Sequence, residues 1–395
     1  MFDIFPVKGG LSVVEGFYCD GVNVGIREGT QPDVAFIRSD NLCDVSATFT
    51  TNKFQAAPIK HYLSHEENFQ TNFILINAKN ANAMTGKRGI EDIETILSAI
   101  PKNLQPHNPL MSSTGVIGYP LPKEKIISAY AQFYFQAKNS DAAAQAIMTT
   151  DSFKKELAYK VELSDGSVFH IAAICKGAGM INPAMATMLC FITTDADIPK
   201  ADMDSLLKQS VDQSFNRISV DGDTSTNDTV MLLANKQSGV YNKEAFSQAL
   251  NMLTHRLAMM ILEDGEGANK VVAFEVKNAA SEADAQKAAK ALSNSLLVKT
   301  ALFGEDPNWG RIASTIGASG IDCDEEKLVI KYDDLIVYSK EFPILDSERE
   351  AKAFEIMKQK SFKITCDIGL GEASFLNYGC DLSYDYVKIN ADYRT

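Results

Sequence analysis

The sequence predicts a mixed α/β fold built from layers of strands and helices, and three observations support this. Short apolar runs with the character of strands recur along the chain. Amphipathic stretches of helical period lie between them, but the alternation is irregular, which argues against a regular doubly wound sheet. The 395 residues, of which 45% are hydrophobic and 23% charged, suit a large globular core divided into more than one domain.

Local patterns locate the individual elements. The expected strands occupy residues 34–37, 73–77, 168–174, 185–193, 271–276, 327–332 and 335–338. The pair Asp333-Asp334 predicts a hairpin between the last two strands. The expected helices occupy residues 90–100, 126–139, 201–218, 244–262 and 283–297. One clear helix and several strands follow residue 275, so we expect a larger catalytic domain (1–275) and a smaller C-terminal α/β domain (276–395).

Composition excludes several classes of function. Asp and Glu number 51 against 38 Lys and Arg, and the resulting charge of −13 argues against nucleic acid or an anionic membrane as partner. No apolar run is long enough to span a bilayer, and the first ten residues lack the pattern of a signal peptide, so we expect a cytoplasmic protein. The seven cysteines form no C-x-x-C pair and the five histidines no zinc motif, so we expect no metal site.

Thr187 is the strongest candidate for chemistry. An apolar run ends at Lys176, a Gly-rich loop follows over residues 177–183, and Thr187 then stands between Ala186 and Met188. Cleavage of the Ala186–Thr187 bond would give Thr187 a free α-amine, which can act as the base for its own hydroxyl. The ordinary alternative is a hydrogen-bonded threonine in an apolar strand, which β-branched residues favour.

Two further segments fit acyl-transfer chemistry. Small residues over 112–120 allow a close backbone approach and N–H groups aimed at an oxyanion, although a tight turn before Pro120 explains them equally well. Acidic residues over 263–268 close the longest expected helix, where the helix dipole disfavours them. Glu266 between two glycines could bind a substrate ammonium, and a solvated acidic turn is the alternative. We interpret two polar stretches, 216–229 and 303–311, as structural loops.

Taken together, these segments resemble the glutamate N-acetyltransferase (ornithine acetyltransferase) family of arginine biosynthesis. The matching motifs, in order, lie at residues 49–52, 56–58, 113–118, 148–151, 176–181, 183–189, 221–228, 263–268, 306–311 and 390–395. The chain departs from the family at Lys79, where glycine is usual, and at Met84, where cysteine is frequent. These departures affect the shape of one loop and leave the motifs of the chemistry intact.

The resemblance implies a fold, a reaction and a set of residues. The fold would be the layered α/β arrangement shared with certain self-processing aminopeptidases. The precursor would cut itself between Ala186 and Thr187 into an α chain (1–186) and a β chain (187–395), which would assemble as an α2β2 heterotetramer or a larger form. The enzyme would move acetyl from N2-acetyl-L-ornithine to L-glutamate, and some members also accept acetyl-CoA, so the resemblance leaves open whether this chain does.

The residue roles implied by the resemblance can be carried over motif by motif. Thr187 would be the nucleophile, with Thr114 and Gly115 forming the oxyanion hole. The implied substrate-binding residues are Thr150, Lys176, Thr187, Glu266, Asn390 and Thr395. A self-processing amidase or aminopeptidase, which passes the acyl group to water, is the rival interpretation and would use Thr187 in the same way.

Overall fold

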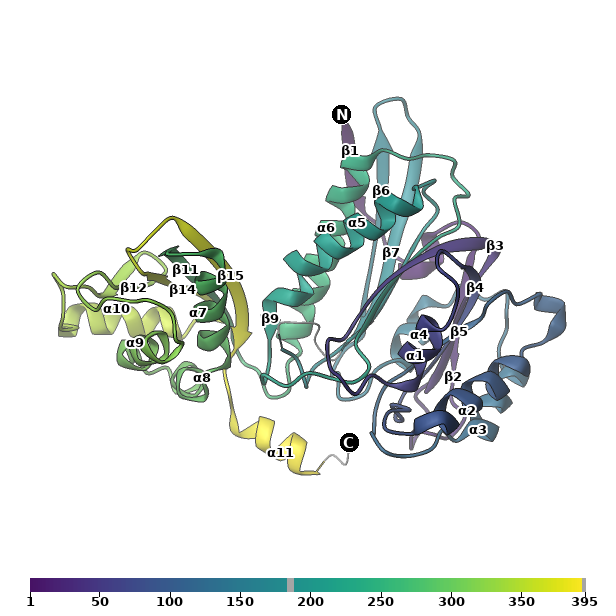
Figure 1. Ribbon diagram of the computed structural model, residues 1–395, viewed down its shortest axis with the longest axis horizontal. Helices are drawn as coiled ribbons and strands as arrows, with labels where there is room; N and C mark the ends of the chain where they lie inside the picture. The colour runs from purple at the N-terminus through teal and green to yellow at the C-terminus, as the bar shows by residue number, and fades with distance from the viewer. Residues whose placement is uncertain (183–187, 393–395) are drawn as a thin grey trace.

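The computed structural model describes residues 1–182 and 188–392. These residues form two β-sheets, which are covered by helices. Figure 1 shows the larger sheet with α5 and α6 on one face, and the smaller sheet beside α7, α9 and α10. The expectation of a mixed α/β fold is confirmed. Within the described ranges, no helix combines the length and apolar character that crossing a membrane requires.

The larger sheet joins nine strands of the described chain in the order β1-β6-β7-β8-β10-β3-β4-β5, with β2 paired to β3. Its strands are β1 (Phe2–Pro6), β2 (Phe17–Val22), β3 (Val34–Phe49), β4 (Gln70–Asn77), β5 (Leu110–Ser113), β6 (Lys155–Leu163), β7 (Val168–Lys176), β8 (Leu189–Thr194) and β10 (Thr229–Ala234). The centre of the sheet mixes directions, since β7 and β8 are antiparallel whereas β8 and β10 are parallel.

The smaller sheet joins six strands of the same ranges in the order β13-β12-β14-β11-β15-β9. Its strands are β9 (Ile218–Ser219), β11 (Val271–Ala279), β12 (Val329–Tyr332), β13 (Leu335–Tyr338), β14 (Ser361–Asp367) and β15 (Ala373–Cys380). The expected hairpin is confirmed, because β12 and β13 pair in antiparallel fashion around Asp333, whose φ of +47° suits a tight turn. The short strand β9 brings the segment before residue 220 onto β15.

The helices pack on both sheets. They are α1 (Ala57–Leu63), α2 (Gly86–Ser98), α3 (Lys123–Ser128), α4 (Ser140–Ala146), α5 (Lys200–Gln213), α6 (Lys243–Glu263), α7 (Glu282–Asn294), α8 (Leu296–Phe303), α9 (Trp309–Ala318), α10 (Ser347–Met357) and α11 (Tyr384–Asp392). The stripe of α6 that includes Leu253 and Leu257 is buried against one face of the larger sheet. Successive residues of β7 face opposite sides of the sheet. Ile171 lies in this core, and Ala172 lies in the core that contains α4.

Three expected helices are wrong in extent, and each has a local reason. The expected helix 126–139 ends at α3 and a 3-10 turn, because Phe133 and Phe135 both pack on Phe36, which residues two apart on a helix cannot do. The helix expected over 201–218 ends at Gln213, and the chain enters β9 at Ile218 instead. The helix 283–297 is two helices, since Ser295 leaves helical geometry and caps α8 by accepting the Val298 N–H.

Candidate active site

The Gly-rich segment after β7 is a fixed turn in the structure. Lys176 is the last residue of β7, so the lysine belongs to a strand and not to a flexible loop. Asp151 Oδ1 accepts the Gly177 N–H at 2.7 Å, which holds the beginning of the turn. Asp221 accepts the N–H groups of Met180 at 2.6 Å and Ile181 at 2.9 Å, which holds its end. Two carboxylates therefore fix the backbone that follows Lys176.

Lys176 presents a buried positive charge at this turn. The residue is 2% exposed, and its ammonium makes no hydrogen bond to another residue of the described ranges. Its charge favours the ionised form of Asp151 and of Asp228, although burial outweighs it at Asp228 and raises the pKa of that group. A buried cation with unused donors suits the carboxylate of a small ligand.

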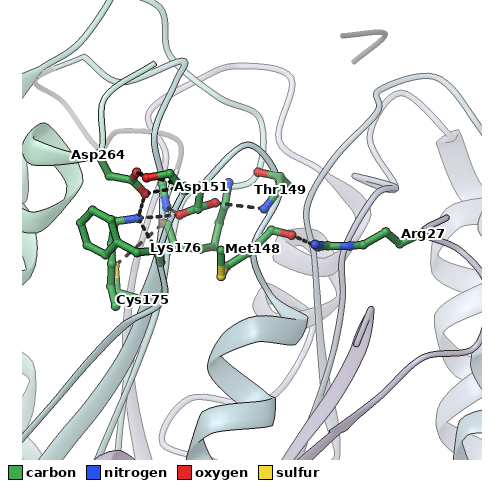
Figure 2. Close-up of polar contacts among 11 residues, drawn as sticks. Arg27, Met148, Thr149, Asp151, Cys175, Lys176 and Asp264 are labelled. Atoms are coloured by element: carbon green, nitrogen blue, oxygen red, sulfur yellow. Dashed lines mark hydrogen bonds and ion pairs between the residues drawn. The ribbon is translucent and has the colours of Figure 1, made fainter. Parts of the chain in front are cut away.

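Thr150 lies in a turn whose flanking residues are held by two carboxylates. The Thr149 N–H donates to Asp151 Oδ2 at 3.0 Å, and the Ser152 N–H donates to Asp264 Oδ1 at 3.0 Å. Figure 2 shows the side chains of Asp151 and Asp264 pointing toward each other, with Thr149 and Lys176 close by. Thr150 is half-buried between its fixed neighbours.

Glu266 adjoins the same turn after the end of α6. Its N–H donates to the Ala178 carbonyl at 2.8 Å, and its carboxylate lies over Gly179, where a Cβ would come within 2.4 Å of it. Asn390 Nδ2 donates to Glu266 Oε2 at 2.7 Å, so α11 returns to this point. Close approach to Glu266 therefore explains why glycine occupies position 179.

The acidic residues at the end of α6 have separate environments. Glu263 pairs with Arg256 on the surface, at 2.6 Å between Oε1 and Nη1. Asp264 is buried and pairs with Lys155, so the unfavourable helix-end charge is neutralised by a lysine distant in sequence. Glu266 adjoins the Lys176 turn. The three acidic residues of this segment therefore have different surroundings, and the ammonium-binding role expected for Glu266 stays a prediction.

Thr114 and Gly115 follow β5 and contact the segment after β4. The Thr114 N–H donates to the Asn77 carbonyl at 3.0 Å, whereas the Thr114 hydroxyl makes no hydrogen bond within the described part of the chain. Gly115 has a φ of +129°, and a Cβ there would come within 2.3 Å of the Lys79 carbonyl carbon. The positive φ and the lack of space for a Cβ both require glycine at this position, and the oxyanion role expected here stays a prediction.

Lys79 explains one departure from the family pattern. Its φ is +67°, in the left-handed region that glycine adopts without strain. The usual glycine at this position therefore matches the backbone that the structure has here. Met84, the other departure, has a φ of +59° and is 63% exposed.

Asn227 and Asp228 belong to the site, although the sequence indicated only a structural loop there. Asn227 Nδ2 donates to the carbonyls of Ala81 at 2.6 Å and Ser113 at 2.8 Å, which ties the Thr114 segment to β10. Asp228 Oδ1 accepts the N–H of Met188 at 3.1 Å. Its Oδ2 is buried without a partner in the described ranges, and burial raises the pKa of Asp228 well above its ordinary value.

The structure brings the expected site residues that it describes into two groups of contacts. Glu266 contacts Ala178 and Asn390, and Thr150 and Lys176 share the partner Asp151 through their neighbours. Thr114 is connected to Met188 through Asn227 and Asp228. Ala186, Thr187 and Thr395 lie outside the described residues. In residues 1–182 and 188–392, no group of His, Cys, Asp and Glu could hold a metal ion.

Comparison with known proteins identifies the family. A family model described as the ArgJ family matches residues 18–395. The chain belongs to the ArgJ family. The arginine biosynthesis bifunctional protein ArgJ of Wolinella succinogenes is 59% identical over 397 residues, covering 100% of both chains. The glutamate N-acetyltransferase of Methanocaldococcus jannaschii is 43% identical over 409 residues, covering 98% of this chain and 99% of the relative.

A solved structure is also similar to this ArgJ-family chain. The crystal structure of the arginine biosynthesis bifunctional protein ArgJ from Bacillus halodurans is 36% identical, with a TM-score of 0.47. The similarity covers 51% of this chain and 97% of that chain. The family predicted from the sequence motifs is therefore confirmed by the family model and by the full-length relatives.

Proposed function

We propose that this ArgJ-family protein transfers the acetyl group of N2-acetyl-L-ornithine to L-glutamate through an acetylated Thr187, as a step of arginine biosynthesis. The observation that carries the proposal is that the strand before one fixed turn ends in a buried cation, Lys176, and that Glu266 binds the same turn through the Ala178 carbonyl. Amino-acid substrates present a carboxylate and an ammonium, so opposite charges at a short spacing suit them. The names of the full-length relatives agree with this reaction.

The proposed chemistry begins with self-cleavage. Attack of the Thr187 hydroxyl on the Ala186 carbonyl breaks the peptide bond, forms an ester and frees the Thr187 α-amine. Water then hydrolyses the ester, which separates an α chain of residues 1–186 from a β chain of residues 187–395. That amine then takes the hydroxyl proton when Thr187 attacks the acetyl carbonyl of acetylornithine. The ornithine amine leaves with a proton, and the acetyl group remains on Thr187 as an ester.

The second half of the reaction returns the enzyme to its starting state. The amine of glutamate attacks the ester carbonyl, N-acetylglutamate leaves, and the Thr187 hydroxyl regains its proton. In both halves, the Thr114 hydroxyl and the Gly115 N–H stabilise the negative oxygen. The Thr114 N–H already donates to Asn77, which leaves the hydroxyl as the donor that this residue can offer.

Substrate binding is assigned to residues around the Lys176 turn. Lys176 would bind an α-carboxylate and Glu266 an ammonium, with Thr150, Asn390 and Thr395 completing the pocket around Thr187. The contact between Asn390 and Glu266 supports a role for the chain end, because α11 reaches the same carboxylate that the substrate would use. We further propose an α2β2 heterotetramer in the cytoplasm, no cofactor, and two domains: a catalytic domain of residues 1–275 and a smaller C-terminal domain of residues 276–395.

The test is an assay of the purified protein with N2-acetylornithine. Release of ornithine should require glutamate, and N-acetylglutamate should form in equal amount. Ornithine released at the same rate without glutamate would favour hydrolysis and contradict the proposal. Acetyl-CoA and glutamate without acetylornithine decide whether a second donor is accepted. Denaturing gels should show two fragments, one of which begins Thr-Met-Leu-Cys, and Thr187→Ala should remain a single inactive chain.

A further inference from the structure

A buried cluster of three charged side chains lies behind the candidate site. Lys155 Nζ contacts Asp151 Oδ1 at 2.7 Å and also contacts Asp264 Oδ2. The three side chains are 0–1% exposed, although Lys155 and Asp264 are separated by 109 positions in the sequence. Burial alone would raise the pKa of Asp151, but Lys155 and Lys176 overcome this and hold the pKa at about 2. Asp151 is therefore ionised at neutral pH, and the neighbouring carboxylates raise the pKa of Lys155 despite its burial.

The other hydrogen bonds of these carboxylates come from backbone N–H groups next to the proposed substrate-binding residues. Asp151 accepts the N–H of Thr149, which precedes Thr150, and the N–H of Gly177, which follows Lys176. Asp264 accepts the N–H of Ser152 at 3.0 Å and is also bound by the Ser152 hydroxyl. Figure 2 shows these carboxylates and the Thr149 amide together with the Arg27 side chain that reaches the Met148 carbonyl.

The connections close into a ring of segments. Asp264 lies two residues before Glu266, whose N–H donates to Ala178 on the Lys176 turn. A path thus leads from the Thr150 turn through Asp151 to the Lys176 turn, on to Glu266, and back through Asp264 to Ser152. Well-packed apolar residues can replace many buried ion pairs without loss of stability. They could not accept these backbone N–H groups, so stability alone does not account for the cluster.

We propose that Asp151, Lys155 and Asp264 act as a positioning cluster, which sets the spacing of Thr150, Lys176 and Glu266 and so of the two charges that hold the substrate. This assignment rests on the proposed function, because it is the substrate that gives the spacing its importance. The cluster does not touch substrate. It acts through the backbone of the residues that do, and its loss should weaken binding of acetylornithine and ornithine more than it slows the chemical step.

Lys155→Met is the direct test, because it removes the ammonium from between two buried carboxylates. We expect kcat/KM for acetylornithine to fall at least about tenfold, mainly through KM, and ornithine affinity in calorimetry to fall by a similar factor. Lys154→Met is the matched control, since the neighbouring lysine also pairs with two carboxylates but lies on the surface. Lys154→Met should keep wild-type values.

A second-site change separates positioning from general damage. When Lys155→Met is combined with Asp264→Asn, one carboxylate remains, the introduced amide can still accept the Ser152 N–H, and its NH2 group can donate to Asp151. This double variant should recover at least about threefold in kcat/KM over Lys155→Met alone, which corresponds to roughly 0.6 kcal/mol. A folded Lys155→Met enzyme with wild-type KM and ornithine affinity would overturn the proposal. So would an equal loss in Lys154→Met, or a double variant no better than the single one.

Two measurements on the wild-type protein distinguish failure of this proposal from failure of the proposed function. One of them also applies if the variants do not fold. If the wild type transfers no acetyl group, the proposed function fails. The geometry of the cluster is then judged by hydrogen exchange, which is also decisive if Lys155→Met does not fold. The amides of Thr149, Ser152 and Gly177 should be protected in the full chain, because buried carboxylates accept them. Exchange of these three amides at the rate of an unstructured peptide would refute the cluster.

Discussion

Asp151 and Asp228 are two buried carboxylates of one site, and they differ in their partners. The Asp151 side chain is 0% exposed and Asp228 is 1% exposed. Asp151 lies 2.7 Å from the Lys155 ammonium and accepts two backbone N–H groups, and its pKa is held at about 2. Asp228 accepts one backbone N–H on Oδ1, its Oδ2 has no partner in the described ranges, and burial raises its pKa.

The difference shows that burial alone does not decide the charge of a carboxyl group. Both groups lose their hydration, and Lys176 acts on both of them. The deciding feature is an ammonium within hydrogen-bond distance, which Lys155 provides for Asp151 but not for Asp228. Asp151 is therefore an ionised group that holds the backbone at Thr149 and Gly177 by accepting their N–H groups. Asp228, which accepts the N–H of the residue that follows Thr187, is held toward its neutral form.

The largest expected effect comes from neutralising each carboxyl in turn. Asp151→Asn should lower the free energy of unfolding by about 3 kcal/mol, because it breaks a buried ion pair and leaves the Lys155 ammonium with one carboxylate partner where it had two. Asp228→Asn replaces a group already held toward neutrality and keeps an acceptor for the Met188 N–H, so its effect should be below about 1 kcal/mol.

Urea unfolding measures both variants at neutral pH. The Thr187→Ala background gives a single chain for every comparison, since no hydroxyl remains for self-cleavage. Equal losses in the free energy of unfolding for Asp151→Asn and Asp228→Asn would contradict this interpretation, because they would mean that a neighbouring ammonium does not determine how much a buried carboxyl group stabilises the protein.

The free energy of unfolding should change with pH in opposite directions for Asp151 and Asp228. The change due to Asp151 should be about 2 kcal/mol. An unfolded aspartate titrates near about pH 3.9. Because the pKa of folded Asp151 is about 2, its stabilisation is complete above about pH 4 and is lost as the pH falls through about 2. The raised pKa of folded Asp228 has the opposite effect, so its contribution declines as the pH rises above about 4.

Urea unfolding across this pH range checks the two signs separately. Asp151→Asn should remove the rise in stability between about pH 2 and 4. Asp228→Asn should flatten the decline above about pH 4, and the part that remains includes Asp221, whose pKa burial also raises. Profiles that change in the same direction in both variants would contradict the assignment.

The smallest effect concerns a single donor to the cluster. Ser152→Ala removes a hydroxyl that donates to Asp264 but retains the backbone N–H at 3.0 Å. Loss of one hydrogen bond to a charged group should cost about 1–2 kcal/mol in the free energy of unfolding. Ser167→Ala is a matched control, because that hydroxyl also donates to an aspartate, Asp165, in an exposed turn. A loss no larger than that of Ser167→Ala would show that Asp264 does not depend on the Ser152 hydroxyl.

Much of the fold was predictable wherever one local signal dominated. The apolar stripe of the helix expected at 244–262 predicted α6 (Lys243–Glu263) within one residue at each end, and Asp333-Asp334 predicted the hairpin of β12 and β13. Sequence periodicity missed β6, because its charged residues Lys155, Glu156, Lys160 and Glu162 resemble an exposed segment. Only the tertiary structure shows that Lys155 is buried between two carboxylates. The boundary near residue 275 stays a prediction.

The candidate site was predictable to the extent that it lies in contiguous motifs. The motifs located Thr114, Gly115, Thr150, Lys176, Glu266 and Asn390. The structure shows contacts that connect the segments of Thr150, Lys176, Glu266 and Asn390, and a separate contact that holds the segment of Thr114, while the roles of all six residues stay predictions. The acidic end of α6 was recognised as unfavourable, but that signal arose from Asp264 as well as from Glu266. Asp151 and Asp264 lie 113 positions apart, and no local pattern in either segment indicates that they share a lysine.

The mass of the β fragment after incubation with N2-acetylornithine alone tests the central claim most directly. If Thr187 carries the acetyl group between donor and acceptor, the fragment that begins at Thr187 should gain the mass of one acetyl group. Addition of glutamate should then remove this mass and release N-acetylglutamate. A β fragment of unchanged mass in an enzyme that still transfers acetyl groups, or an active chain that is never cut, would contradict the account.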